Sequence, residues 1–354
     1  MTVYFYHTQD IQYILGRMKE GKFPSHYLYG AAHLPDEGIS VVWHKSSRGL
    51  PRWRETLRTA WHVLRASRSI DAVYATHYKG MELIVLLRAL GLFRKPIIVW
   101  HHQPVITPRS RLREWGGRLF YRGLDRMIFF SQKLVDDSLH SPKARRERMV
   151  VGHWGADLDF YDRIRTCRSR SGFISTGKEQ RDQATLVNAF NAAGCRLTMY
   201  VGINKDPSVP NPNLEAFEKL RPADNVEVKK IMGLLPYELA VEVDKAACVC
   251  VCCKPTRYTA GLTTVVEALA LGLPVICSRN PQIPVDFDLE GCGVSVAYHD
   301  VDGWARAAAY IEANPDIAAE MGRRGRELAE SKFNDRQCAR EVAAVIKSCL
   351  KTKE

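Results

Sequence analysis

Residues 247–278 of the chain read ACVCVCCKPTRYTAGLTTVVEALALGLPVICS. The apolar run at 247–252 predicts a buried strand, and the run at 275–278 predicts a second one. Between them, residues 263–271 are apolar almost throughout and follow the turn residues that open a helix. A strand, a helix and a second strand in this order form the repeating unit of parallel α/β sheets. The segment therefore predicts an α/β fold.

The same alternation runs through the rest of the chain. Further strands are predicted at 3–6, 39–42, 72–75, 97–100, 127–130, 173–176 and 197–201. Helical periodicity lies between them at 53–67, 81–90, 183–193 and 236–246. The pattern stops at a polar, basic stretch, 162–171, and then begins again. This predicts two doubly wound domains, 1–165 and 166–354, with a ligand cleft at the carboxyl ends of their strands and helices at the C-terminus.

The composition is that of a globular protein. Of the 354 residues, 46% are hydrophobic and 25% are charged, which is enough for substantial cores. The first strand has no basic flank, and no stretch approaches the ~18 apolar residues of a membrane helix, so we expect a cytoplasmic protein. The ten cysteines are expected to be reduced thiols. Four of them, Cys248, Cys250, Cys252 and Cys253, are spaced mostly two residues apart, as residues on one face of a strand are. This spacing favours core packing over a zinc site.

The net charge of +12 indicates an anionic partner or a contribution to solubility. Basic residues cluster at 109–126, 143–148 and 163–170. In the first cluster, a helix would show an apolar stripe beside arginines, formed by Leu112, Trp115, Leu119 and Phe120. Two interpretations are open: a membrane-surface helix, or an ordinary helix that buries its stripe, which is the commoner case. We expect no nucleic-acid partner, because no nucleic-acid motif is present and the basic clusters are separate.

The turn before residues 263–271 has the features of an anion site. The N–H groups of Gly261, Leu262 and Thr263 would point outward at the positive end of the helix dipole, where a diphosphate can bind. Glu267 lies one turn beyond Thr263 on the same face and could accept hydrogen bonds from ribose hydroxyls. The structural alternative makes Thr263 a helix cap and Glu267 a solvated acid.

At this point the chain resembles a known family. Residues 260–276 are similar to the donor-site signature of the group 1 glycosyltransferases (family 4), which have the GT-B fold of two facing Rossmann-like domains with a central cleft. Further similar segments lie at 150–160, 175–186 and 321–327. The resemblance implies an N-terminal acceptor-side domain and a C-terminal domain that binds a nucleotide sugar and ends in closing helices.

The resemblance also assigns roles to two groups outside the signature. The family holds the donor phosphates with a basic pair, and Lys178, after Gly177, and Arg181 stand at these positions, with Lys178 in place of the usual arginine. Two cations between a strand end and a helix suit phosphate on physical grounds as well, although surface charge is the structural alternative. The family has a histidine near the reacting carbon of the sugar. His101 and His102 both follow strand 97–100, and the spacing selects His102.

The activity implied is glycosyl transfer from a nucleotide-sugar donor to a glycan or lipid-linked acceptor, with retention at the anomeric carbon and without a metal or other cofactor. Donor binding is assigned to Gly177, Lys178, Arg181, Gly261, Leu262, Thr263 and Glu267. Catalysis is assigned to Glu267, through the ribose, and to His102, near the sugar or the acceptor hydroxyl. Polysaccharide biosynthesis would suit such a basic protein, with the inner face of an anionic membrane as a further partner.

Departures from the family pattern leave alternatives open. A second acid that many members place before the glutamate is Thr259 here, and His7 stands where a glycine-rich loop would follow the first strand. A nucleotide-sugar 2-epimerase of the same fold and a degenerate, noncatalytic member are therefore rival interpretations. Asp157 and Asp159 have the spacing of a metal motif from another fold, but their place beside the domain boundary indicates a turn and a helix cap.

Overall fold

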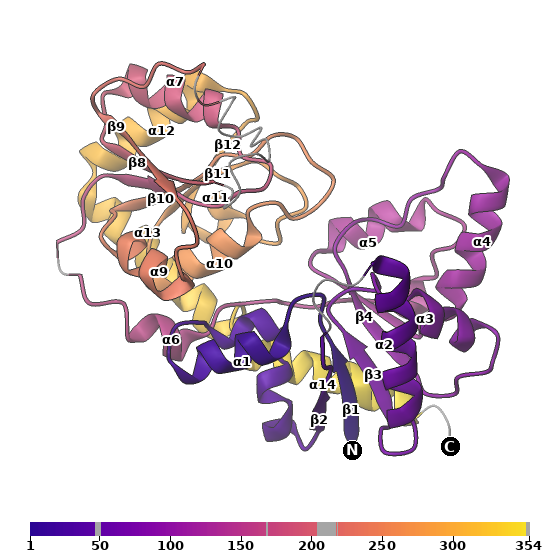
Figure 1. Cartoon of the computed structure of the whole chain (residues 1–354). Helices are drawn as coiled ribbons and strands as arrows, with labels where there is room; N and C mark the ends of the chain where they lie inside the picture. Colours follow the sequence, from indigo (N-terminus) through magenta and orange to yellow (C-terminus); the bar gives the residue numbers. More distant parts are fainter. Residues whose placement is uncertain (47–50, 168, 204–216, 218, 352–354) are drawn as a thin grey trace. The chain divides into compact units, whose positions relative to one another are not determined.

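The computed structural model describes residues 1–46, 51–167, 169–203, 217 and 219–351, which form two compact units (Figure 1). The first unit contains Met1–Glu20, Ser25–Trp154 and Asp335–Glu354, and the second contains Gly21–Pro24 and Gly155–Asn334. Each unit is built on a six-stranded sheet whose neighbouring strands are parallel. The predicted fold of two Rossmann-like α/β domains is confirmed.

The sheet of the first unit has the strand order β2-β1-β3-β4-β5-β6. Its strands are β1 (Thr2–Tyr6), β2 (Ser40–Trp43), β3 (Ala72–Ala75), β4 (Ile97–His101), β5 (Arg126–Phe129) and β6 (Met149–Val151). Its helices are α1 (Ile11–Lys19), η1 (Ser25–Leu28), η2 (Ala31–Glu37), α2 (Arg52–Ala66), α3 (Glu82–Ala89), α4 (Arg111–Arg122), α5 (Gln132–Leu139), η3 (Arg146–Arg148) and α14 (Asp335–Lys351). The chain moves across the sheet in one direction from β2 to β6, so right-handed crossovers place α2, α3 and α4 on one face.

The sheet of the second unit has the strand order β12-β11-β10-β7-β8-β9. Its strands are β7 (Phe173–Ser175), β8 (Leu197–Gly202), β9 (Val226–Ile231), β10 (Cys248–Val251), β11 (Val275–Ser278) and β12 (Gly293–Val296). Its helices are α6 (Leu158–Asp162), α7 (Gln183–Ala193), α9 (Pro236–Asp244), α10 (Leu262–Leu271), α11 (Phe287–Glu290), α12 (Val301–Ala313) and α13 (Pro315–Ser331). Helices α10 and α13 pack against each other, as do α7 and α12.

The central strands were predicted from their apolar runs because they are buried on both faces of the sheet. Strands β3, β4, β10 and β11 have every residue buried, as parallel strands covered on both faces require. The core of the second unit contains the packed rings of Phe173 and Phe190, whose centroids lie 5.1 Å apart, and Trp304 from α12. Cys248 and Cys250 of β10 belong to the same core, which confirms their predicted packing role.

The strands that the patterns did not predict are β6, β9 and β12, and each is an edge of its sheet. An edge strand pairs with one neighbour only, so it needs less apolar surface than a central strand. Strand β9 reads VEVKKI and β12 reads GVSV. Polar residues interrupt both, and β6 is only three residues long. None of the three therefore shows the long apolar run that marks a central parallel strand.

The two units differ from the expected domains 1–165 and 166–354. Apart from the short piece Gly21–Pro24, the chain enters the second unit at Gly155, eleven residues before the expected residue 166, and returns to the first unit at Asp335. Helix α14 therefore belongs to the first unit, although its neighbours along the chain, α12 and α13, belong to the second.

Contacts between residues far apart in the sequence hold α14 in the first unit. Asp335 Oδ2 lies 2.9 Å from His33 Nε2, and Glu341 Oε1 lies 2.9 Å from His153 Nδ1. The helix also buries one apolar face. An amphipathic pattern predicts that a face is covered, but it does not say which sheet covers it.

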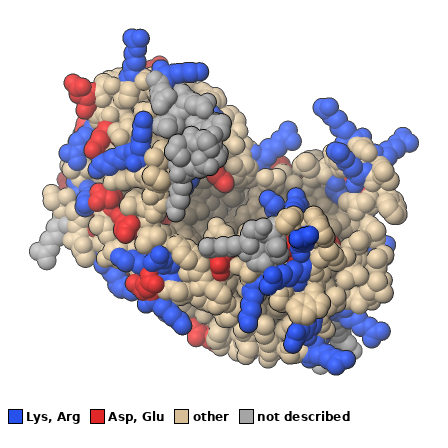
Figure 2. Space-filling view, in the orientation of Figure 1, with Lys and Arg blue, Asp and Glu red and all other residues tan. Residues whose placement is uncertain are grey.

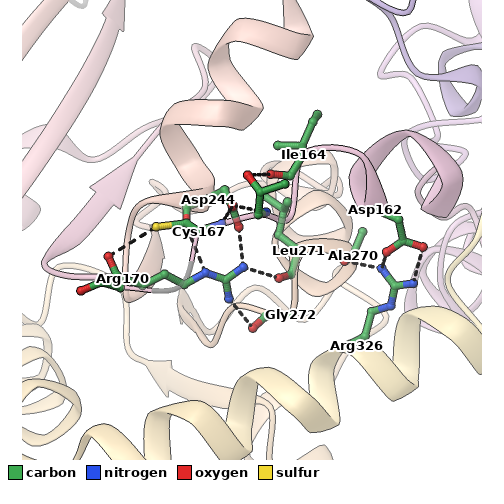
Figure 3. A network of polar contacts seen from close by, with 11 residues as sticks. Asp162, Ile164, Cys167, Arg170, Asp244, Ala270, Leu271, Gly272 and Arg326 are labelled. Atoms are coloured by element: carbon green, nitrogen blue, oxygen red, sulfur yellow. Dashed lines mark hydrogen bonds and ion pairs between the residues drawn. The ribbon is translucent and has the colours of Figure 1, made fainter.

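The basic stretch 162–171, where the predicted pattern of strands and helices stops, lies within the second unit, and its Arg170 is bound there (Figure 3). The guanidinium of Arg170 donates to the carbonyl oxygens of Leu271 at 2.9 Å and Gly272 at 3.2 Å, and it also pairs with Asp244. The charge of Arg170 therefore has a structural role, since it binds the last carbonyl groups of α10.

A second arginine binds the same end of α10. Arg326 of α13 donates from Nη1 to the carbonyl oxygen of Ala270 at 2.7 Å, and it pairs with Asp162 at 2.7 Å (Figure 3). Cations at a helix C-terminus complement the negative end of the helix dipole. The two arginines thus stabilise the C-terminus of α10, the helix whose N-terminus is the predicted anion site.

No helix within the described ranges has both the length and the apolarity to cross a bilayer.

Candidate functional site

Two neighbouring strands and a helix start meet in the second unit. Strand β7 pairs with β10, and both run in the same direction, so their carboxyl ends lie at one edge of the sheet. The loop after β7 returns to the loop after β10 through an isolated bridge between Arg181 and Cys253. The residues predicted in two separate segments, 177–181 and 261–267, are thereby brought together.

Helix α10 begins at a glycine that no other residue could replace without strain. Gly261 is the N-cap residue, with φ of 93° in the left-handed region and no side-chain cap. A Cβ atom on it would lie 2.5 Å from Cγ1 of Val251. The Thr263 cap of the structural alternative is therefore not found, and the N-cap is a backbone position. An N-cap without a side chain leaves the first-turn N–H groups to an external acceptor.

The amide of Leu262 does not have the role expected of it. Its N–H donates to the carbonyl oxygen of Thr259 at 3.1 Å, which closes the turn before the helix. The N–H of Val265 donates to the carbonyl oxygen of Gly261 at 3.0 Å and is the first intrahelical bond. Of the amides predicted to bind an anion, Leu262 is thus a turn residue, while that of Thr263 lies in the first turn of the helix.

Burial singles out one face of α10. The buried residues of this helix are Leu262, Thr264, Val265, Val266, Ala268, Leu269, Ala270 and Leu271. The other two are Thr263, which is exposed, and Glu267, which is half-buried. Their spacing of four residues puts both on the same face, one turn apart, as predicted. The open face of the helix start therefore carries a hydroxyl and a carboxylate.

Arg181 is buried, unlike an arginine that projects into solvent to bind phosphate. Its guanidinium is buried and donates from Nε to the carbonyl oxygen of Thr176 at 2.8 Å and from Nη2 to Oγ1 of Thr264 at 3.1 Å. It also lies against the two predicted glycines. A Cβ atom on Gly177 would be 2.2 Å from Nη2, and one on Gly261 would be 3.7 Å from Nη1. Arg181 thus holds the β7 loop against the helix start and places a fixed positive charge there.

Lys178 has a different position from Arg181. It is exposed, and its methylene stem lies over Gly202 at the end of β8, where a Cβ atom would be 2.4 Å from Cε. Strand β8 is the parallel neighbour of β7, so the carboxyl ends of the two strands lie side by side. An extended lysine at the carboxyl edge of a parallel sheet can follow a charged ligand, since its ammonium sits on a flexible stem.

In the first unit, the two candidate histidines differ clearly. His101 is buried: its Nε2 lies 2.9 Å from the hydroxyl of Tyr121, and burial lowers its pKa to about 4. His102 is half-buried, and its Nε2 lies 2.9 Å from the carbonyl oxygen of Thr76. A carbonyl oxygen only accepts, so Nε2 of His102 carries the proton and Nδ1 is the basic nitrogen of the neutral ring. His102 is thus the better placed of the pair for a ligand.

Residues that the sequence patterns did not single out surround His102. The ring of His77 stacks on it at 5.4 Å, and the ring of Tyr29 lies 5.9 Å from both His102 and His7. Burial, with the nearby His102, lowers the pKa of His7 and of His77 to about 4. His7 follows β1 and His77 comes two residues after β3. A search for polar residues within two positions of the end of each predicted strand would have found both.

A further pair joins the site of the second unit. Nδ1 of His299, which follows β12, lies 2.6 Å from Oδ2 of Asp182, the N-cap residue of α7. His299 has φ of 61°, an uncommon value for a residue other than glycine. The weak pattern of the edge strand β12 hid this residue, because a strand end cannot be located where the strand is not predicted.

Two other motifs have structural roles. Asp157 is the N-cap of α6 and accepts a hydrogen bond from the N–H of Phe160 at 2.9 Å, which confirms the predicted helix cap. All ten cysteines are free thiols, and burial raises the pKa of Cys248 to about 12. Within the described residues, no group of three or more His, Cys, Asp or Glu side chains is arranged to hold a metal ion.

Comparison with known proteins agrees with the family suggested by the sequence. Residues 215–328 match the family model of the glycosyl transferases group 1. A D-inositol 3-phosphate glycosyltransferase from Saccharomonospora viridis is 39% identical over 64 residues, which span 18% of this chain and only 15% of that relative. The recognition of a group 1 glycosyltransferase segment is confirmed for this part of the chain.

Solved structures extend the likeness to both units. HepE of Anabaena in complex with UDP-glucose has a TM-score of 0.68 at 14% identity, covering 98% of this chain and 100% of that one. An α,α-trehalose 6-phosphate synthase from Burkholderia multivorans has a TM-score of 0.72 at 11% identity, covering 100% and 99%. At these identities the likeness shows the fold alone, which is the GT-B fold of paired Rossmann-like domains.

Proposed function

We propose that this chain, whose residues 215–328 belong to the group 1 glycosyl transferases, moves a sugar from a nucleotide-sugar donor to an acceptor hydroxyl. The observation that carries the proposal is the start of α10. An uncapped helix N-terminus, formed at Gly261 with a left-handed backbone, stands beside the buried guanidinium of Arg181, and the only unburied side chains of the helix are Thr263 and Glu267.

This arrangement suits a nucleoside diphosphate. The first-turn amide of Thr263 and the ammonium of Lys178 would bind the phosphate oxygens, and Glu267 would accept hydrogen bonds from the ribose hydroxyls one turn further on. Arg181 hydrogen-bonds both the loop after β7 and the first turn of α10, which fixes their relative position, and it adds a positive charge to the site. Gly177 admits that guanidinium, since any side chain there would collide with it.

In the reaction, the bond between the anomeric carbon and the diphosphate oxygen breaks, and a bond from the acceptor oxygen to that carbon forms. The diphosphate leaves with the electron pair, and the acceptor hydroxyl loses its proton. Lys178 and the α10 start would stabilise the negative charge that grows on the leaving diphosphate, without need of a metal ion. We propose retention at the anomeric carbon, in keeping with the family resemblance.

The first unit would supply the acceptor side. His102 is half-buried at the carboxyl edge of the sheet, with Nε2 bound to the carbonyl of Thr76. Its Nδ1 would approach the sugar or the acceptor hydroxyl. We propose a glycan or lipid-linked acceptor, and a place in polysaccharide biosynthesis at the cytoplasmic face of a membrane, because the net charge of +12 favours an anionic surface.

Calorimetric titration of the full chain with UDP, GDP and ADP and their sugars tests the donor site. The UDP series comes first, since HepE was solved with UDP-glucose. We expect one series to bind, and Glu267→Gln and Lys178→Ala to weaken it about tenfold to a hundredfold, as loss of a charged hydrogen bond does. Glu290→Gln, at an exposed acid of α11, is the matched control. Binding that is unchanged in both site variants, or no binding in any series, contradicts the proposal.

A further inference from the structure

The outer face of α2 has an unusual composition. Between residues 52 and 68, all of which are described, every exposed side chain is either an arginine or a large apolar residue. The apolar ones are Trp53, Leu57, Trp61 and Leu64, which are 60%, 51%, 54% and 41% exposed. Their spacing of four, four and three residues forms one continuous stripe along the helix. The arginines beside the stripe are Arg52, Arg54, Arg58, Arg65 and Arg68.

No acidic side chain between residues 52 and 68 is exposed. Glu55, the acid of α2, is half-buried rather than exposed. A surface helix of an ordinary globular protein mixes both signs of charge on its outer face and buries its large apolar residues. Helix α2 instead buries Thr59, Ala60 and Val63 and exposes both of its tryptophans.

Helix α4 repeats the pattern. It has no buried residue, and its Leu112 and Trp115 are 77% and 66% exposed. Its only acid, Glu114, is half-buried and bonded to Lys143 at 3.0 Å. The exposed arginines of this helix and the residues before it are Arg109, Arg111, Arg113, Arg118 and Arg122. The commoner interpretation of this stripe, burial within its own domain, is therefore wrong for Leu112 and Trp115.

The two stripes belong to one layer of the first unit. Helix α3 packs against both α2 and α4, on the same face of the sheet (Figure 1). Figure 2 shows lysines and arginines gathered over the part of the surface, at the right of the view, where α2 and α4 lie. Two helices with the same composition thus flank a third on one side of the unit.

We infer that the outer faces of α2 and α4 form a docking surface for a membrane of anionic lipids. Arginine binds lipid phosphates, and tryptophan and leucine gain free energy when they enter the boundary between headgroups and acyl chains. The guanidinium groups of Arg54 and Arg65 lie 5.0 Å and 5.4 Å from the ring centroids of Trp53 and Trp61. This pairing holds cation and ring together at the depth where lipid headgroups meet the hydrocarbon.

Other occupants fit these observations less well. A second copy of the chain would bring arginines against arginines, and like charges at an interface are unfavourable. A nucleic acid would be bound by the arginines, but it would leave the exposed leucines without a partner. An anionic lipid surface satisfies the charge and the apolar stripe together. The inference deepens the proposed function, because an enzyme docked in this way would meet an acceptor embedded in the membrane, yet docking requires no donor site.

Sedimentation of the full chain with extruded vesicles tests this surface. Vesicles of phosphatidylcholine alone are compared with vesicles that also contain phosphatidylglycerol. We expect binding to the anionic vesicles that weakens with salt, and a loss of at least about tenfold in the pairs Trp53→Ser with Trp61→Ser and Leu112→Ser with Trp115→Ser. Leu289→Ser is the matched control, because Leu289 of the second unit is 82% exposed.

Several outcomes would overturn the inference. These are equal binding to neutral and anionic vesicles, wild-type binding by both double variants, or a dimer in sedimentation that the Trp53 and Trp61 variant abolishes. Binding of single-stranded RNA in place of vesicles would assign the surface to nucleic acid instead. If a double variant melts earlier than wild type, quenching of wild-type tryptophan fluorescence by brominated anionic lipids decides the question. Nucleotide binding by calorimetry is a separate readout, so failure of docking and failure of the donor site remain distinguishable.

Discussion

Nη2 of Arg181 donates to Oγ1 of Thr264 at 3.1 Å and so joins the loop after β7 to the first turn of α10. The same guanidinium bonds the carbonyls of Thr176 and Glu179. We expect Arg181→Met to destabilise the protein by about 3 kcal/mol, because buried acceptors lose their donor, and Thr264→Val to cost about 1 kcal/mol. Urea unfolding of both variants and of the double variant measures the coupling. Additive effects would mean that the two residues do not interact in solution.

Arg326 is expected to matter for stability, while its neighbour Arg323 is not. Both lie on α13, but the side chain of Arg326 is 10% exposed and bonds the carbonyl of Ala270, whereas that of Arg323 is 57% exposed. Arg326→Met should cost about 2 kcal/mol through the lost cap of α10, and Arg323→Met no more than about 0.5 kcal/mol. Equal melting temperatures of the two variants would contradict a capping role for Arg326.

Gly155 marks the point where the chain enters the second unit, and close packing rather than φ requires the glycine. A Cβ atom there would lie 1.8 Å from the carbonyl carbon of Phe333. Gly155→Ala should cost about 3 kcal/mol or more, since backbone must move. Gly194→Ala is the comparison: its φ is 71° but no atom lies within 4 Å, so about 1 kcal/mol is expected. Denaturant midpoints of similar size would show that the contact at Gly155 relaxes freely.

Stability should fall in mild acid. Burial lowers the pKa to about 4 in each of four histidines of the first unit, namely His7, His44, His77 and His101. The unfolded chain has histidine pKa values near 6.5, so between pH ~6.5 and ~4 it binds more protons than the folded protein. Lowering the pH through this window therefore favours unfolding, and the stabilisation is complete above it.

Urea unfolding at a series of pH values measures this effect. His44→Gln should give a shallower pH dependence than wild type, since it removes one buried histidine and keeps a polar partner for the Tyr4 hydroxyl, now 2.7 Å from Nδ1. The same change at exposed His140 is the control. A wild-type free energy of unfolding that is constant from pH 7 to about 4 would count against the buried, neutral state of these rings.

The central strands and the helices between them could be predicted from local pattern, because strands covered on both faces require continuous apolar runs. Helix α7 occupies the predicted residues 183–193, and β11 occupies 275–278. The edge strands could not be predicted, since one neighbour demands little apolar surface. His299 at the end of β12 was missed for the same reason.

The residues of the candidate site could be proposed from the sequence, but the contacts between them could not. Gly261 directly precedes the helix, and Thr263 and Glu267 are four residues apart, so helix geometry alone puts these two side chains on one face near the glycine. Arg181 was predicted as a cation of the site, but its contacts with Thr176 and Thr264 depend on which strands are neighbours. A sequence pattern does not contain that order.

By itself, the sequence determined the α/β class, the repeated strand and helix units, and the open helix start at Gly261, because these follow from periodicity and backbone preference over short spans. Only the tertiary structure decided that α14 packs with the first sheet, that Arg170 and Arg326 cap the far end of α10, and that the stripe on α2 is left exposed. Each of these depends on contacts between residues distant in the chain. An amphipathic pattern states that a face exists, and only packing states whether anything covers it.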